Sequence, residues 1–219
     1  MNLFNPEHDL CLANGDPNYS PPQSALKFGE DCSKIMDIIV PGCRRSHSPA
    51  TPSVWGWNLV ARNRLLKAGC SMGELPTIAQ IEHIRSLSHR HALDASSYIA
   101  SAAQKSDFIA EELFDIMSVK AFVNSYDEVV LKAPWSGSGK GLRWVSRNMM
   151  NDSDLGWCVK VIEKQGSVIG ERKVRIAENF AQLFYISDRV SFVGYSLFSC
   201  ENGAYKSNVL ASDELIFNT

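Results

Sequence analysis

The sequence has no hydrophobic run long enough to cross a membrane. Apolar stretches such as Ile38–Val40 and Val129–Leu131 are far shorter than the roughly 18–20 residues that a membrane-spanning helix needs. The first nine residues, Met1–Asp9, contain neither the basic segment nor the apolar segment of a secretion signal. We therefore expect no membrane partner and a cytoplasmic location.

Paired cysteines are also missing. The six cysteines are scattered along the chain without any C-x-x-C pair, so neither a structural zinc site nor a disulfide framework is supported. In a chain without an export signal, the thiols are expected to be reduced and mostly buried.

No charge of one sign dominates, because 22 Lys and Arg residues stand against 24 Asp and Glu residues, for a net charge of −2. A chain so balanced lacks the basic excess of a nucleic-acid binder, and no nucleic-acid partner is expected. Apolar residues, in contrast, are plentiful. They make up 45% of the 219 residues, which is enough for one large domain or two small ones.

The first 110 residues are expected to form a small open α/β domain. Turn formers crowd the first fifty residues, which favours short strands joined by ordered loops over long helices. Helices are predicted from Ser53 to Gly69, after the cap Thr77, and over residues 89–104. We place the boundary near residues 105–115, which gives domains over 1–110 and 111–219.

The second domain favours an antiparallel sheet with helices. Its predicted elements are a helix over Glu111–Ser125, strands over 129–133 and 142–145, and a helix from Ser153 to Gly166. Strand-forming runs and short turns then alternate over residues 171–198, which is typical of an antiparallel meander.

The most informative segment is a glycine-rich loop between two of these strands, KAPWSGSGKGL from Lys132 to Leu142. Its alternate glycines, Gly137, Gly139 and Gly141, leave backbone N–H groups free to face an anion. Lys132 lies in the preceding strand, where its ammonium can reach phosphates beneath such a loop. The pattern predicts a hairpin that closes over a nucleotide.

Two common phosphate-binding loops do not fit. A Walker A loop needs glycine where Pro134 stands and Ser or Thr where Gly141 stands, and it opens a helix rather than a strand. The dinucleotide-binding G-x-G-x-x-G motif has a different glycine spacing and also leads into a helix. The alternative to a nucleotide flap is a plain surface hairpin whose glycines relieve turn strain and whose lysines, Lys132 and Lys140, are solvated.

With this segment, the chain resembles the ATP-grasp superfamily over roughly residues 111–210. The resemblance rests mainly on Val130–Pro134 running into Ser136–Gly141. It implies an ATP-grasp-like domain of antiparallel sheet with helices, behind an N-terminal α/β domain, with ATP held between two α+β subdomains. It also implies ATP and Mg²⁺ as cofactors and chemistry through an acyl-phosphate.

The resemblance also assigns residues to ATP. Lys120 and Lys132 are similar to two phosphate-binding lysines, Glu171 to the acid near adenine, and Glu178 to the carboxylate that binds the ribose. Lys206 would approach the phosphates from the opposite subdomain. The loop would contribute Ser136, Gly137, Ser138, Gly139, Lys140 and Gly141. The alternatives are an exposed helix lysine at 120, solvent-facing strand charges at 171 and 178, and a plain β-turn around 206.

The metal site departs from the family pattern. ATP-grasp enzymes usually hold magnesium with late acidic residues and an asparagine, with one residue between the last acid and the asparagine, whereas Asp213, Glu214 and Asn218 have another spacing. No metal ligand and no catalytic residue is therefore assigned. The magnesium-binding strands are expected beyond Thr219.

Two polar segments of the first domain invite other interpretations. The cluster His89-Arg90-His91 lacks a third ligand at metal-binding spacing, and side chains two apart on a helix point to different faces. Ordinary surface histidines are therefore expected. The opening residues 5–10, NPEHDL, either face the active cleft or form a structural turn.

Three functions are compatible with these patterns. The first is an ATP-dependent carboxylate–amine ligase that forms an acyl-phosphate from unidentified small-molecule substrates. The second is a nucleotide-binding or substrate-binding module without turnover, and the third is an interaction domain that has lost ATP binding. The oligomeric state is not predicted.

Overall fold

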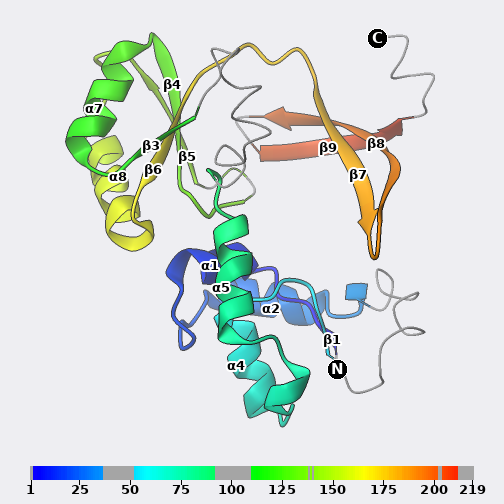
Figure 1. Ribbon diagram of the computed structural model, residues 1–219. Helices are drawn as coiled ribbons and strands as arrows, with labels where there is room; N and C mark the ends of the chain where they lie inside the picture. The colour runs from blue at the N-terminus through cyan, green and yellow to red at the C-terminus, as the bar shows by residue number, and fades with distance from the viewer. Residues whose placement is uncertain are drawn as a thin grey trace.

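The structure is a computed structural model that describes residues 2–36, 52–91, 110–137, 139, 141–201 and 204–211. Figure 1 shows short helices at the N-terminal end, then a four-stranded sheet with two helices, and then a three-stranded sheet. The predicted boundary near residue 110 stays a prediction, because most of the chain around it lies outside the described residues, as does most of the helix predicted over 89–104.

The N-terminal region, residues 2–91, is built mainly from short helices. Strand β1 (Asn2–Leu3) pairs in parallel with β2 (Ser53–Val54). The helices are α1 (His8–Asn14), α2 (Gln23–Asp31), α4 (Leu59–Lys67), the 3-10 helix η2 (Met72–Glu74) and α5 (Ile78–Leu87). Sequence patterns missed α1 and α2. Turn-forming residues indicate loops, but such residues also occur at helix ends, as Gly15 does at the end of α1 with a φ of +75°.

The predicted helices of this region were right in place and partly wrong in extent. Thr77 caps α5, and its side chain accepts a hydrogen bond from the N–H of Gln80, as expected. Helix α4, however, begins after Asn58 and not after Ser53, which lies in β2. Gly69, predicted to follow the helix, has a φ of +94°.

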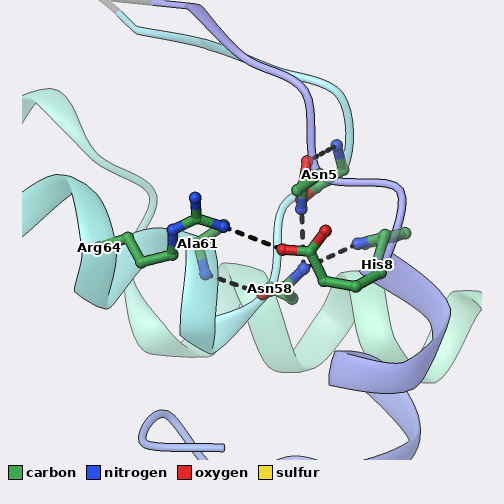
Figure 2. Close-up of polar contacts among 7 residues, drawn as sticks. Asn5, His8, Asn58, Ala61 and Arg64 are labelled. Carbon is green, nitrogen blue, oxygen red and sulfur yellow. Dashed lines mark hydrogen bonds and ion pairs between the residues drawn. The ribbon is translucent and has the colours of Figure 1, made fainter. Parts of the chain in front are cut away.

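Buried polar side chains near the start of the chain hold this region together (Figure 2). The side-chain amide of Asn5 donates to the carbonyl of Gly56 at 2.8 Å and accepts from its N–H at 3.1 Å. Asn58 caps α4 and also lies 3.0 Å from Nδ1 of His8. Residues 5–8 therefore act as structural residues.

A charged pair completes this network. The buried carboxylate of Glu7 accepts a hydrogen bond from the guanidinium of Arg64 at 2.9 Å, which compensates its charge inside the fold.

The four-stranded sheet has the order β3-β6-β4-β5, and all neighbouring strands are antiparallel. Its strands are β3 (Glu111–Leu113), β4 (Glu128–Lys132), β5 (Leu142–Ser146) and β6 (Val168–Arg172). Helices α7 (Ile116–Ser125) and α8 (Asp152–Gln165) lie together on one face of the sheet (Figure 1).

The core lies between this sheet and its two helices. Val129 and Leu131 of β4 are fully buried there, against Val119 and Val123 of α7 and Cys158 of α8. Full burial of such a side chain contributes about 1.5–3 kcal/mol relative to exposure. The core fixes which face of β4 points inward, and therefore which face carries Lys132.

Two predicted boundaries of this region need correction. Glu111–Leu113 form β3 and not the first turn of a helix, because the carboxylate of Asp115 caps α7 by accepting the N–H of Ser118. Likewise, Asn151 rather than Ser153 caps α8. The predicted end of α8 at Gly166 is confirmed, with a φ of +90°.

The chain ends in a three-stranded antiparallel sheet of β7 (Asn179–Ile186), β8 (Val190–Glu201) and β9 (Ala204–Ala211). The meander was predicted to start at residue 171, but residues 168–172 pair with β3 and β4 instead. The prediction of an antiparallel sheet with helices is confirmed. Of the described helices, none is both long and apolar enough to span a bilayer.

Candidate functional site

A cleft of about 760 Å³ lies between the four-stranded sheet and the start of the three-stranded sheet. Its wall is the face of β4, β5 and β6 that points away from α7 and α8. The far side is formed by the segment that leaves β6 and by β8. The cleft is lined by Val130, Lys132, Leu142, Trp144, Glu171, Arg172, Lys173, Val174, Ile176, Ala177, Asn179 and Cys200.

Strand alternation places Lys132 in this cleft. Val129 and Leu131 point into the core, so Val130 and Lys132, between and after them, point the opposite way. The Lys132 ammonium donates to the carboxylate of Glu171 on β6, with Nζ and Oε2 2.5 Å apart. Only 20% of the Lys132 side chain is exposed, so this lysine is not the solvated surface residue of the alternative interpretation.

The same face of the sheet carries an apolar patch. Val130 pairs in register with Trp144 of β5, and Lys132 with Leu142. All four line the cleft, with Lys132 and Leu142 next to the glycine-rich loop and Val130 and Trp144 further from it. Lys132 therefore lies at the loop end of this face, and the apolar side chains of Val130 and Trp144 lie further from the loop.

Two further cations lie on this wall. Lys173 is held by Glu128 at 2.9 Å. Arg172 makes no ion pair with any residue that the structure describes. In the sheet it lies opposite Val129, three ladder positions from Lys132 and at the end of the wall away from the glycine-rich loop.

The two limbs of the glycine-rich loop approach each other closely at its base, between Ala133 and Gly141, and we call this part of the loop the neck. The N–H of Ala133 donates to the carbonyl of Gly141 at 2.9 Å, and a Cβ on Gly141 would lie 2.2 Å from Oγ of Ser136. Gly139, at the tip, has a φ of +73°. Ser138 and Lys140, both predicted to bind ATP, lie outside the described residues.

A second cavity of about 620 Å³ lies on the other side of the loop, against α1 and α2. Gly137 and Gly141 line this cavity and are absent from the lining of the cleft. A Cβ on Gly137 would lie 2.3 Å from Oδ2 of Asp9, so the loop backbone passes directly against α1. Glycine is needed at 137 for this approach unless Asp9 moves.

The remaining predicted residues lie at the edge of the cleft or away from it. Lys120 is exposed on α7, on the far side of the sheet. Glu178 is exposed and lines a hollow of about 380 Å³ beside the cleft. Lys206 pairs with Glu201 at 2.9 Å and does not line the cleft. Of the five residues assigned outside the loop, the structure brings together Lys132 and Glu171.

Sequence patterns missed several lining residues. The alternation of β5 was enough to place Trp144 beside Val130, but the segment after β6 was assigned to the meander, so Arg172, Lys173 and Asn179 were not considered. Magnesium ligands also stay unassigned: the described residues contain no group of three acidic, His or Cys side chains placed to hold a metal ion, and Asp213, Glu214 and Asn218 fall beyond them.

No protein-family model matches the chain, and no curated protein matches it. Among solved structures, the chain is similar to N5-carboxyaminoimidazole synthetase from Staphylococcus aureus complexed with ADP. The identity is 15% and the TM-score 0.49, over 93% of this chain and 56% of that protein.

Two further solved structures are similar at comparable levels. D-alanyl-alanine synthetase A from Vibrio cholerae has 15% identity and a TM-score of 0.44, over 63% of this chain and 46% of that one. The biotin carboxylase domain of 2-oxoglutarate carboxylase from Hydrogenobacter thermophilus, in complex with MgADP, ADP and bicarbonate, has 14% identity and a TM-score of 0.48, over 84% and 40%. The chain thus spans about half the length of the solved structures it matches.

Proposed function

We propose that the chain binds ATP in the cleft between the two sheets. The observation that carries the proposal is the ion pair of Lys132 and Glu171, which lies beside the apolar side chains of Val130 and Trp144 on the strand that leads into the glycine-rich loop. The cleft volume of about 760 Å³ falls within the range of about 300–1,000 Å³ that is typical of small-molecule sites.

The ion pair and the apolar side chains of the cleft suit the phosphates and the base of a nucleotide. Phosphates at the loop end would replace Glu171 as the partner of Lys132. The base would lie against the apolar side chains of Val130 and Trp144. Magnesium is part of the proposal through the ATP-grasp resemblance, and no step is assigned to it.

The finer proposal is an ATP-dependent ligase that joins a carboxylate to an amine. In this reaction a carboxylate oxygen attacks the γ-phosphorus and ADP leaves, which gives an acyl-phosphate. The amine then attacks the acyl carbon, and phosphate leaves with the carboxylate oxygen. The contribution of Lys132 would be to neutralise charge on the transferred phosphoryl group.

Thermal unfolding with and without ATP and Mg²⁺ tests the binding proposal. At a nucleotide concentration of 100 times Kd, binding stabilises the native state by about 2.7 kcal/mol, which corresponds to a rise in Tm of roughly 5–10 °C for a chain of this size. Lys132→Ala should remove most of this rise. Lys160→Ala, at an exposed position of α8 on the other face of the sheet, should leave it unchanged.

The possible outcomes distinguish among ATP binding, the location of the site and ligase activity. No rise in the wild type at millimolar nucleotide rules out ATP binding by this chain, and an equal rise in Lys132→Ala rules out the site. The ligase proposal further predicts release of inorganic phosphate that requires a carboxylic acid and an amine together. Binding without such release, over a panel of free amino acids, would favour a nucleotide-binding module.

A further inference from the structure

The first limb of the glycine-rich loop is held by a residue from the N-terminal region. The Arg90 guanidinium donates to the carbonyl of Ser136 at 2.6 Å, to its hydroxyl at 3.1 Å and to the carbonyl of Ala133 at 3.0 Å. The backbone N–H of Arg90 also donates to the carbonyl of Pro134 at 3.2 Å. One arginine thus binds three of the four consecutive positions 133–136.

Trp135, the remaining position, is held by two neighbours of Arg90. Its indole N–H donates to the carbonyl of Arg85 at 2.9 Å, and the Arg85 guanidinium lies 4.0 Å from the centre of its ring. The ring of His89 packs edge-on against it, with centroids 4.6 Å apart. His89 is therefore partly buried in an interface, which corrects its prediction as an ordinary surface histidine.

Arg85 and His89, which hold Trp135, also contact α1 and the four-stranded sheet. The Arg85 guanidinium donates to the carbonyl of Leu12 in α1 at 2.7 Å. His89 lies 3.4 Å from the carboxylate of Glu112 on β3, which also accepts the hydroxyl of Ser167 at 2.6 Å. Residues 85–90 therefore connect α1, the four-stranded sheet and the loop.

Contacts within the neck connect Ser136, which Arg90 holds, to the second limb of the loop. The Ser136 hydroxyl, which Arg90 contacts, donates to the carbonyl of Ala133 at 3.2 Å and lies where a Cβ on Gly141 would be. With Ala133 bonded to Gly141 across the neck, the two limbs of the loop are locked to each other. The direction in which the chain continues from Ser136 to Gly137 therefore depends on where Arg90 holds Ser136.

We propose that Arg90 is a positioning residue of the nucleotide site, through which the N-terminal region sets the place of the glycine-rich loop over the phosphates. The inference rests on the proposed ATP binding. A charged donor with three acceptors in fixed directions is hard to replace, because lysine has neither the reach nor the fork geometry. Arg90 acts on ATP through the loop and does not line the cleft.

The test compares ATP with adenosine, because the loop concerns the phosphates and not the base. Calorimetric titrations of the full chain would measure the affinities of both ligands, with Mg²⁺ present, for the wild type, Arg90→Ala and Arg90→Lys. Arg62→Ala is the matched control, since Arg62 also donates to a backbone carbonyl, that of Pro76 at 2.9 Å, away from the loop. The Tm of each nucleotide-free variant would be recorded as well.

We expect Arg90→Ala to weaken ATP binding about tenfold to a hundredfold, the size of a lost charge-assisted hydrogen bond, with adenosine affinity unchanged. Arg90→Lys should recover part of the loss, and Arg62→Ala should bind ATP as the wild type does. An equal loss for ATP and adenosine would show a general structural role and overturn the inference, as would unchanged ATP binding in Arg90→Ala. If the wild type binds no ATP, the proposed function and this inference fall together.

Discussion

Among single residues, His8 shows how the polar start of the chain contributes to stability. Burial lowers the pKa of His8 below its ordinary value, and the attraction of the neighbouring Asp9 carboxylate offsets this only in part. Because Nδ1 of His8 accepts a hydrogen bond from the amide of Asn58 (Figure 2), the native network requires the neutral imidazole. Protonation would replace an acceptor by a second donor facing the Asn58 amide.

This environment makes stability depend on pH in a defined direction. A histidine whose folded pKa lies below its unfolded value of about 6.5 binds fewer protons in the native state, so its contribution is fully present above pH 6.5 and is lost as the pH falls below it. His89, whose pKa is also lowered mainly by burial, adds to the same trend. The Tm should therefore fall between pH 7.5 and pH 5.5.

Substitution at His8 should reduce this loss. His8→Gln should show a smaller fall in Tm over this range than the wild type, and His8→Gln with His89→Gln a smaller one still. His83→Gln, at an exposed position of α5, should follow the wild-type curve. The same pH dependence in His8→Gln and in the wild type would contradict the assignment.

At the level of elements, the packing of α7 on the sheet leaves no space at one glycine of β6. A Cβ on Gly170 would lie 2.7 Å from the ring of Phe122 and 3.0 Å from Leu113. Both neighbours belong to the core and cannot withdraw into solvent. Gly170→Ala should lower the free energy of unfolding by about 1–3 kcal/mol, the usual cost of overpacking a core.

Gly156→Ala is the matched control for this prediction. Gly156 lies in the exposed part of α8, and a Cβ there would meet nothing within 4 Å. The substitution should raise the free energy of unfolding by up to about 1 kcal/mol, because alanine favours a helix interior. Urea denaturation of both variants measures the two changes, and the same sign for both would contradict the account of the packing.

Sequence patterns predicted the elements where local chemistry determines them. Thr77 with Gln80, the β-branched run before Lys132 and Gly166 after α8 each act within a few residues. The start of α4 was placed wrongly because Ser53 pairs with Asn2, 51 positions earlier, and is not free to cap a helix. The errors thus arise where a residue that local patterns assign to one element pairs instead with a segment far away in the sequence.

The whole molecule determines the site. Lys132 and Glu171 are 39 positions apart and meet because β6 pairs with β4 and thereby interrupts the order of the strands along the chain. Arg90 and the loop residues that it contacts are more than forty positions apart in the sequence. The motif at 132–142 identified the loop and its lysine, but such partners follow only from the assembled sheet and the place of the N-terminal region beside it.

Cysteine chemistry can test where a nucleotide binds in the assembled molecule. Cys200 of β8 is exposed and lines the same cleft as Lys132 and Glu171. Burial raises the pKa of the Cys11 thiol to about 12 and that of Cys158 to about 11, and only the thiolate reacts with alkylating agents. Alkylation of the native chain should therefore reach Cys200 well before Cys11 or Cys158.

If ATP occupies the space between the two sheets, it should shield Cys200. We expect ATP with Mg²⁺ to slow the reaction of Cys200 with iodoacetamide severalfold, as followed by mass spectrometry of its peptide, and to leave Cys32 of the N-terminal region unaffected. Lys132→Ala should remove the protection, because the phosphates lose their partner in the cleft. Equal protection of Cys32 would indicate a general tightening of the chain, and unprotected Cys200 in a chain that nevertheless binds ATP would place the nucleotide outside the cleft.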